Sequence, residues 1–143
     1  MFSFFPSRLS SCREEIGFFQ DPGSDYGRLS LELLRAVRLV VDTGIHSQGW
    51  TREEALAYVH ANGVSDEIDR YLAWPAQALS YKVGQFNILE LRNRAQQQLG
   101  ARFDLKAFHD EILSGGNLPL DMLDARVNSW IATQLANGTH APK

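Results

Sequence analysis

The residues best placed for chemistry form a run of charged and titratable side chains near the end of the first third of the chain. They are spaced three or four residues apart: Arg35, Arg38, Asp42 and His46. Such spacing puts side chains on one face of a helix, so the four would lie together if the helix continues as far as His46. A guanidinium, a carboxylate and an imidazole in one place can bind a carboxylate or polarise a carbonyl. The alternative is a surface ion pair between Arg38 and Asp42 beside a solvated loop histidine.

A second candidate is Tyr81, which lies in a largely apolar segment. Polar neighbours stand one helical turn or less away: Gln77, Lys82 and Gln85. Polar groups on a buried helix need hydrogen-bond partners. A tyrosine hydroxyl that faces a cleft can stabilise an oxyanion, whereas one in a core makes a single structural hydrogen bond. The residues alone leave both interpretations of Tyr81 open.

The spacing of the histidines does not indicate a metal site. Apart from His46 they are His60, His109 and His140, and the first two are expected on the surface. The stretch that begins at His109 lacks the second histidine of an HExxH zinc helix. Cys12 has no base nearby in the sequence, so thiol catalysis is not indicated either. We therefore expect this chain to hold no metal by itself.

Composition predicts one globular domain with one core. The chain has 143 residues, of which 44% are hydrophobic and 22% are charged, and its formal net charge is -3. That charge argues against a nucleic-acid partner. A single cysteine cannot form an internal disulfide, and no apolar run approaches the roughly 18 residues that a membrane span needs. We expect a soluble, cytoplasmic protein with no membrane partner.

The first residues contain a short stretch, 9–12, that fits the pattern at which bacterial lipoproteins are cleaved and lipidated. A secretory signal also needs a positive segment followed by an apolar one, and Pro6 and Arg8 interrupt that order here. We therefore interpret the match as accidental and expect a disordered or atypical leader at 1–14. A disordered tail is expected at 137–143.

Apolar residues recur at helical spacing along the rest of the chain, and no alternating run predicts a strand. The fold class is therefore predicted to be all-α, a single domain of about six helices. Asp25 is expected to cap the first helix, and its apolar stripe is expected to face the core: Leu29, Leu33, Ala36, Val37 and Val40. The helices are predicted at 25–43, 51–62, 65–74, 75–99, 104–114 and 119–136. Thr51 and Glu54 are expected to form a capping box, and Asp104 is expected to cap the helix that follows it. The helix at 75–99 is apolar on most sides, which is typical of a buried central helix.

Two long strings of the sequence resemble the bacterial domain-of-unknown-function family 885. The first string runs through 27–53 and contains the residues of the Arg38 to His46 run, and the second runs through 70–84 and contains Tyr81. Shorter similarities occur at 103–110 and 118–120. The resemblance covers roughly 15–131 and implies one helical domain at 15–136 that is the C-terminal part of the family domain.

Members of that family resemble helical zinc metallopeptidases, whose HExxH helix lies upstream of the part represented here. The resemblance implies that His46 and Tyr81 polarise a scissile carbonyl or hold its oxyanion. It also implies that Arg38 and Asp42 orient these two side chains. The residues expected to bind a peptide-like substrate are Arg38, Asp42, Gln77 and Lys82. Zinc is expected in full-length relatives and not in this chain alone.

Three hypotheses for function follow. The first is a substrate-cleft fragment of a zinc-dependent peptidase or other hydrolase, which is inactive alone and pairs with a missing N-terminal half. The second is a non-catalytic helical module that associates with itself. The third, a small independent enzyme built on His46, Asp42 and Tyr81, has the least support, because positioned side chains alone do not replace a metal and its activated water.

Overall fold

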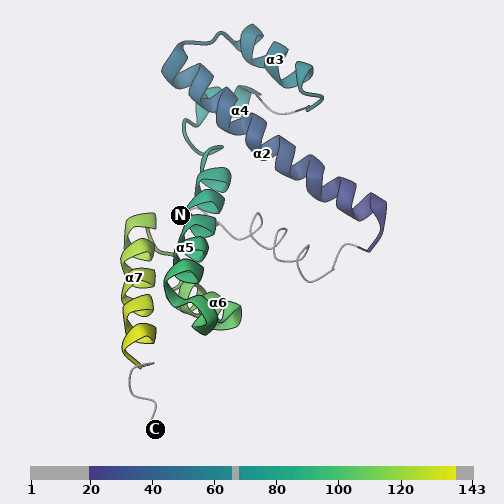
Figure 1. Ribbon diagram of the computed structural model, residues 1–143. Coiled ribbons are helices and arrows are strands. Elements are labelled where there is room, and N and C mark those ends of the chain that lie inside the picture. The colour runs from purple at the N-terminus through teal and green to yellow at the C-terminus, as the bar shows by residue number, and fades with distance from the viewer. Residues whose placement is uncertain (1–19, 66–67, 138–143) are drawn as a thin grey trace. The chain divides into compact units, whose positions relative to one another are not determined.

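The computed structural model describes residues 20–65 and 68–137, and within them every regular element is helical (Figure 1). This confirms the all-α prediction. The elements are α2 (Pro22–Gln48), α3 (Arg52–Ala61), α4 (Ile68–Ala73), α5 (Ser80–Leu99), a short 3₁₀ turn η1 (Gly100–Arg102), α6 (Leu105–Ser114) and α7 (Leu120–Asn137). The leader predicted at 1–14 lies outside the described residues, as does the predicted tail apart from Asn137. No described helix combines the length and apolar character needed to cross a bilayer.

The start of α2 lies one turn earlier than predicted. Asp21 is the N-cap, and its carboxylate accepts a hydrogen bond from the Ser24 backbone N–H at 2.9 Å. Pro22 follows in the first turn, where a missing N–H costs nothing. Asp25, which the sequence predicted as the cap, instead forms an ion pair with Arg28 at 2.8 Å. The prediction of Asp25 was wrong because two aspartates one turn apart can both cap, and the proline selects the first.

The end of α2 also differs from prediction, since the helix passes through Gly44 and reaches Gln48. It stops at Gly49, whose φ of 72° is left-handed and suits glycine. The residue at helical position 44 is a glycine because the indole of Trp50 packs directly on it. A Cβ at this position would lie 2.4 Å from the ring. The Trp50 backbone N–H donates to the Gly44 carbonyl at 2.9 Å. A glycine that resembled a helix end is therefore a packing site inside the helix.

The described residues form two compact units, and the boundary between them lies between Gln85 and Phe86 in α5. The N-terminal unit holds α2, α3, α4 and the start of α5, and its core consists of Val37, Val41, Ala55, Val59, Ile68, Tyr71 and Ala78. The sequence predicted one core, whereas the structure has one cluster of buried apolar side chains in each unit. A capping box between Thr51 and Glu54 begins α3, as the sequence predicted.

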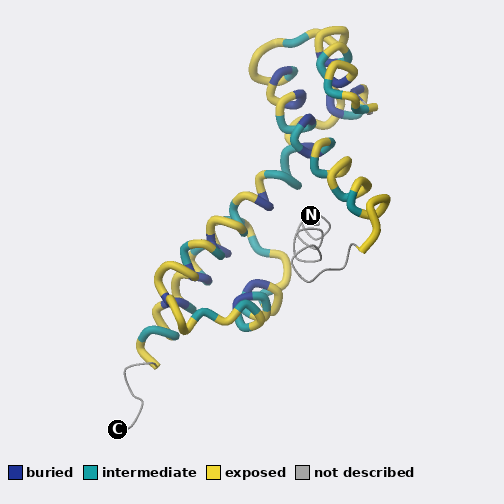
Figure 2. The backbone as a smooth tube through the Cα atoms, turned by 45° about the vertical axis from the view of Figure 1, so that its right-hand side comes forward, coloured by how far each residue is buried: buried dark blue, intermediate teal, exposed yellow. Residues whose placement is uncertain are grey.

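α2 buries only part of the face that was predicted, and Val37 is the member of that face that lies in the core. Leu29, Leu33 and Val40 were expected in the core, but they are exposed to 51%, 45% and 37%. The buried residues of α2 are Arg35, Val37, Val41, Asp42 and Gly44, all in its second half. Exposure of the first half is visible in Figure 2, where its turns are mostly yellow. The prediction failed because periodicity identifies an apolar face but not whether any described element covers it.

The link from α4 to α5 is a series of turns, so α5 begins at Ser80 and not at Pro75. Ala76 has a positive φ of 65°, which no right-handed helix accommodates. The Gln77 carbonyl accepts hydrogen bonds from the Ser80 N–H and hydroxyl at 3.3 and 2.8 Å. This turn is therefore held by the first residue of α5 and also from α2, where Asp42 accepts a hydrogen bond from the Ala76 N–H.

α5 buries a smaller part of its surface than the buried central helix that the sequence predicted. Val83, Phe86 and Leu89 are exposed to 42%, 53% and 38%. The fully buried positions of its second half are Leu91, Ala95 and Leu99, which follow one stripe. The helix is apolar on several sides, but only one side belongs to the core of its unit.

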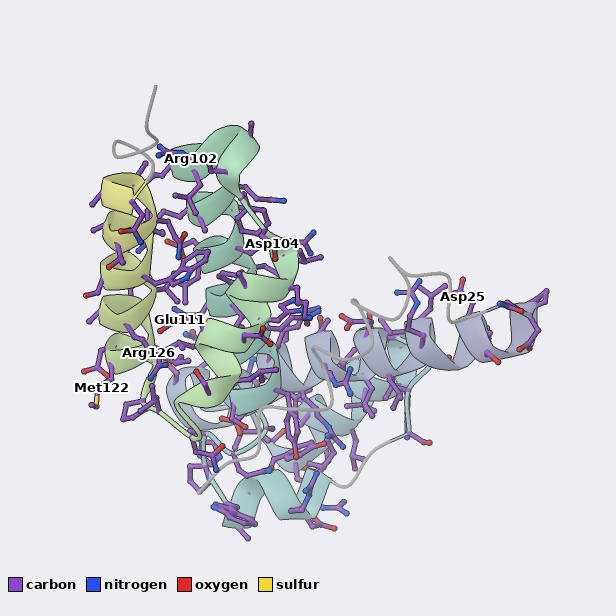
Figure 3. All side chains as sticks on the ribbon, turned by 90° about the horizontal axis from the view of Figure 1, so that it is seen from below. Asp25, Arg102, Asp104, Glu111, Met122 and Arg126 are labelled. Atoms are coloured by element: carbon purple, nitrogen blue, oxygen red, sulfur yellow. The ribbon has the colours of Figure 1, made fainter. Side chains whose placement is uncertain are left out.

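The C-terminal unit packs the second half of α5 with α6 and α7 around Phe108. Asp104 caps α6 as predicted, because its carboxylate accepts from the Ala107 N–H at 2.6 Å. Arg126 of α7 and Glu111 of α6 point toward each other (Figure 3) and pair at 2.7 Å. The same guanidinium donates to the Glu111 carbonyl at 3.0 Å, so Arg126 ties the two helices together.

Candidate functional site

His46 lies in the last turn of α2 with an exposed side chain. Its Nε2 atom lies 2.9 Å from the backbone carbonyl oxygen of Tyr71 in α4. A carbonyl oxygen can only accept a hydrogen bond, so Nε2 carries the proton in this contact. In the neutral ring Nδ1 is then the unprotonated nitrogen. An exposed imidazole is thus fixed in one orientation and one tautomer.

Asp42 lies one turn before His46, and it is buried to all but 2%. Its Oδ1 atom accepts a hydrogen bond from the Ala76 backbone N–H at 3.1 Å. The second oxygen, Oδ2, is buried without a hydrogen-bond partner among the described residues. Asp42 lies in the interior. The alternative that Arg38 and Asp42 form an ion pair on the surface is therefore wrong. The carboxylate instead holds the turn around Ala76, whose left-handed backbone needs an anchor.

Arg38 lies one turn before Asp42 and stacks on the same part of the chain. Its guanidinium carbon is 5.7 Å from the centre of the Tyr71 ring, and that of Arg70 is 5.3 Å from it. Tyr71 is almost fully buried, so the two guanidinium groups cover its ring from the outside. Arg38, Asp42 and His46 therefore contact the segment from Tyr71 to Ala76, as their shared side of the helix predicted. Arg35, the fourth residue of the predicted group, lies beside Glu32 instead.

The structure brings Gln77 beside this group and leaves Tyr81 separate. Gln77 directly follows Ala76 in the anchored turn and is buried. Tyr81 lies in the first turn of α5 and is half-buried, and among the described residues it makes no hydrogen bond with His46. The roles that the resemblance implies for Gln77 and Tyr81 stay predictions.

Lys82 belongs to a second polar group that the sequence did not predict. Its ammonium lies 2.6 Å from Oε2 of Glu32 in α2. Oε1 of the same carboxylate accepts from the Gln85 amide at 3.1 Å and lies 3.7 Å from the Arg35 guanidinium. Glu32 therefore joins α2 to the start of α5. The only signal in the sequence was its position three residues before Arg35, and its partner is 50 residues away.

The described residues do not assemble a metal centre among themselves. Over 20–65 and 68–137, no three histidine, cysteine, aspartate or glutamate side chains come together as metal ligands. Asp42 and His46 share a helix side, but the oxygen of one binds the Ala76 N–H and the Nε2 of the other binds the Tyr71 carbonyl.

This chain is similar to one bacterial protein family and to part of a longer protein of known structure. The family described as "Bacterial protein of unknown function (DUF885)" matches residues 11–127. A solved structure described as "the crystal structure of the putative lipoprotein from Colwellia psychrerythraea" is 44% identical and superposes with a TM-score of 0.86. The match covers 91% of this chain and 23% of the Colwellia chain, so this chain spans less than a quarter of that protein. None of the curated proteins matches.

Proposed function

Since the chain belongs to the bacterial family DUF885, we propose that it forms the substrate-cleft part of a larger zinc-dependent hydrolase that acts on peptide-like substrates. The Colwellia protein supports the first half of this proposal. In that protein the matching fold makes up less than a quarter of a much longer chain. The family resemblance to metallopeptidases supports the second half. Alone, this chain is expected to be inactive.

The observation that carries the proposal is the fixed, exposed imidazole of His46. An exposed histidine without a partner rotates freely, and a catalytic group must instead be held within a narrow range of positions. The Tyr71 carbonyl holds Nε2, which leaves Nδ1 as the only ring nitrogen that can meet a substrate. In its neutral form Nδ1 accepts a proton, and in its protonated form it donates a hydrogen bond to a carbonyl or an oxyanion.

The groups behind His46 act as positioning residues in this proposal. Asp42 anchors the Ala76 turn, and Arg38 covers the ring of Tyr71, whose carbonyl orients the imidazole. Tyr81 is proposed as the oxyanion donor, and Gln77 and Lys82 as residues at the substrate. Zinc supplies Lewis-acid chemistry when the longer protein binds it, and the steps assigned to this chain are orientation of the substrate and proton transfer at Nδ1.

A chimera tests the role of His46 within a complete protein. In it, residues 20–137 of this chain replace the matched part of the Colwellia protein, and hydrolysis of a peptide library is followed by mass spectrometry. His46→Ala should reduce hydrolysis by at least about 100-fold, the usual range for a lost acid–base group. The matched control is His60→Ala, which removes an exposed histidine of α3 in the same unit. Equal activity in the two variants would refute the role of His46.

The cellular location is also a proposal. We propose the cytoplasm on the composition alone, since a single cysteine forms no internal disulfide. Fractionation of cells that produce the native gene product tests this, because a lipid-anchored protein would sediment with the membranes and show the expectation to be wrong.

A further inference from the structure

α2 carries an apolar stripe that the described residues leave exposed. Tyr26, Leu29, Leu33 and Val40 are exposed to 74%, 51%, 45% and 37%. They follow one another at intervals of three, four and seven residues, which keeps them on one side of the helix. We call these four residues the α2 stripe.

Three of the four residues of the α2 stripe precede the packed part of the helix. Every buried residue of α2 lies from Arg35 to Gly44, in a helix that α3 and α4 contact. Helices in proteins gain most of their stability from packing of their apolar face. An apolar stripe that extends about two turns beyond the buried part of a 27-residue helix therefore indicates a partner.

We propose that the α2 stripe is the docking surface for the portion of the family protein that lies outside the part matched here. The Colwellia chain has the same fold at 44% identity, and more than three quarters of that chain lies outside the match. A stripe with spacings of three and four residues suits an apolar helix as its partner. This inference deepens the proposed function and rests on its first half, the larger family protein, and not on hydrolysis.

A second copy of the chain is a poorer fit to the same stripe. Helices that pair with themselves repeat the apolar spacing over three or more heptads and carry complementary charges beside it. The α2 stripe covers about two heptads. Glu32, which lies beside it, is paired with Lys82 and is not available for an ion pair with a second copy.

Cysteine labelling tests the proposal without any assay of activity. Leu33→Cys and Leu31→Cys are each introduced into the isolated chain with Cys12→Ser, and into the chimera freed of other cysteines. Leu31 is the matched control, because it is exposed to 47% on the same helix but lies on the side away from the α2 stripe. In the chimera, a maleimide should react at Leu33→Cys at least roughly tenfold more slowly than in the isolated chain. Leu31→Cys should react at similar rates in both.

Two results would overturn the proposal. The first is fast labelling of Leu33→Cys in a chimera that melts cooperatively. The second is protection of Leu33→Cys in the isolated chain that disappears on dilution, because a second copy would then cover the stripe. If the chimera does not fold, the same two cysteines at the aligned positions of the whole Colwellia protein give the same readout. Protection without hydrolysis would refute the proposed function and leave the docking surface in place.

Discussion

Two glycines of α2 should respond in opposite ways to the same change. Gly27 and Gly44 both lie inside the helix, where alanine is intrinsically better than glycine by about 1 kcal/mol. Nothing lies within 4 Å of a Cβ added at Gly27. Gly27→Ala is therefore expected to stabilise the protein by about 1 kcal/mol.

At Gly44 the same methyl group meets the indole of Trp50. The added Cβ would lie 2.4, 2.5 and 2.9 Å from three atoms of that ring. The ring cannot withdraw easily, because Trp50 packs on Tyr58 at 5.5 Å and its backbone N–H is bound to Gly44 itself. Overpacking of this kind costs about 1–3 kcal/mol, which exceeds the gain in helix propensity. We expect Gly44→Ala to destabilise the protein by up to about 2 kcal/mol after that gain is included.

Urea denaturation followed by far-UV circular dichroism measures both variants. The midpoint of Gly27→Ala should rise and that of Gly44→Ala should fall, at unchanged slope. Removing the ring should abolish the difference, so Gly44→Ala in a Trp50→Ala background should no longer destabilise. If Gly44→Ala is as stable as Gly27→Ala, the close packing of Trp50 on α2 is refuted.

Three further predictions concern the anchored turn and the charged surface. Asp42→Ala should destabilise by about 1–3 kcal/mol through loss of the acceptor for the Ala76 N–H, whereas Asp42→Asn keeps an acceptor and should cost less, by urea denaturation. Ala76→Gly should stabilise by up to about 1 kcal/mol, because it removes a side chain from a positive φ, and its melting temperature should rise. The hydrogen bonds of Arg52 lower the pKa of Asp69 below 3.8, so their contribution is present above that pH and is lost as the pH falls through the lowered pKa. The urea midpoints of the wild type and Asp69→Asn should therefore converge in acid, and a constant gap would contradict the ion pair.

Local signals in the sequence predicted local structure well. The capping box at Thr51 and the cap at Asp104 depend on residues three positions apart, and the structure has both. Helical spacing also predicted that Asp42 and His46 share a side of α2. That prediction needs only the helix to continue past Gly44, and the packing of Trp50 permits it.

Features that depend on distant residues were not predicted. Glu32 pairs with Lys82 across 50 positions, and no pattern within α2 indicates that partner. The burial of Asp42 depends on a turn 34 positions away, so the sequence left a surface pair open. Leu29 and Leu33 have the spacing of core residues, yet the described residues leave them exposed, because a pattern shows an apolar face and not its partner.

The corner between α2 and α3 has a consequence for how this protein folds. The Trp50 N–H bonds to Gly44, Gly49 ends the helix, and Thr51 and Glu54 cap each other, so every contact joins residues within about one turn of α2 or α3. Contacts this close in sequence close short loops and form early, whereas the Glu32 to Lys82 pair must wait for a much longer loop. The corner that sets the direction of α3 should thus form before the Ala76 N–H bonds to Asp42. By the same reasoning the His46 to Tyr71 contact, which spans 25 positions, should form on a finished corner and before the Glu32 to Lys82 pair, which spans 50.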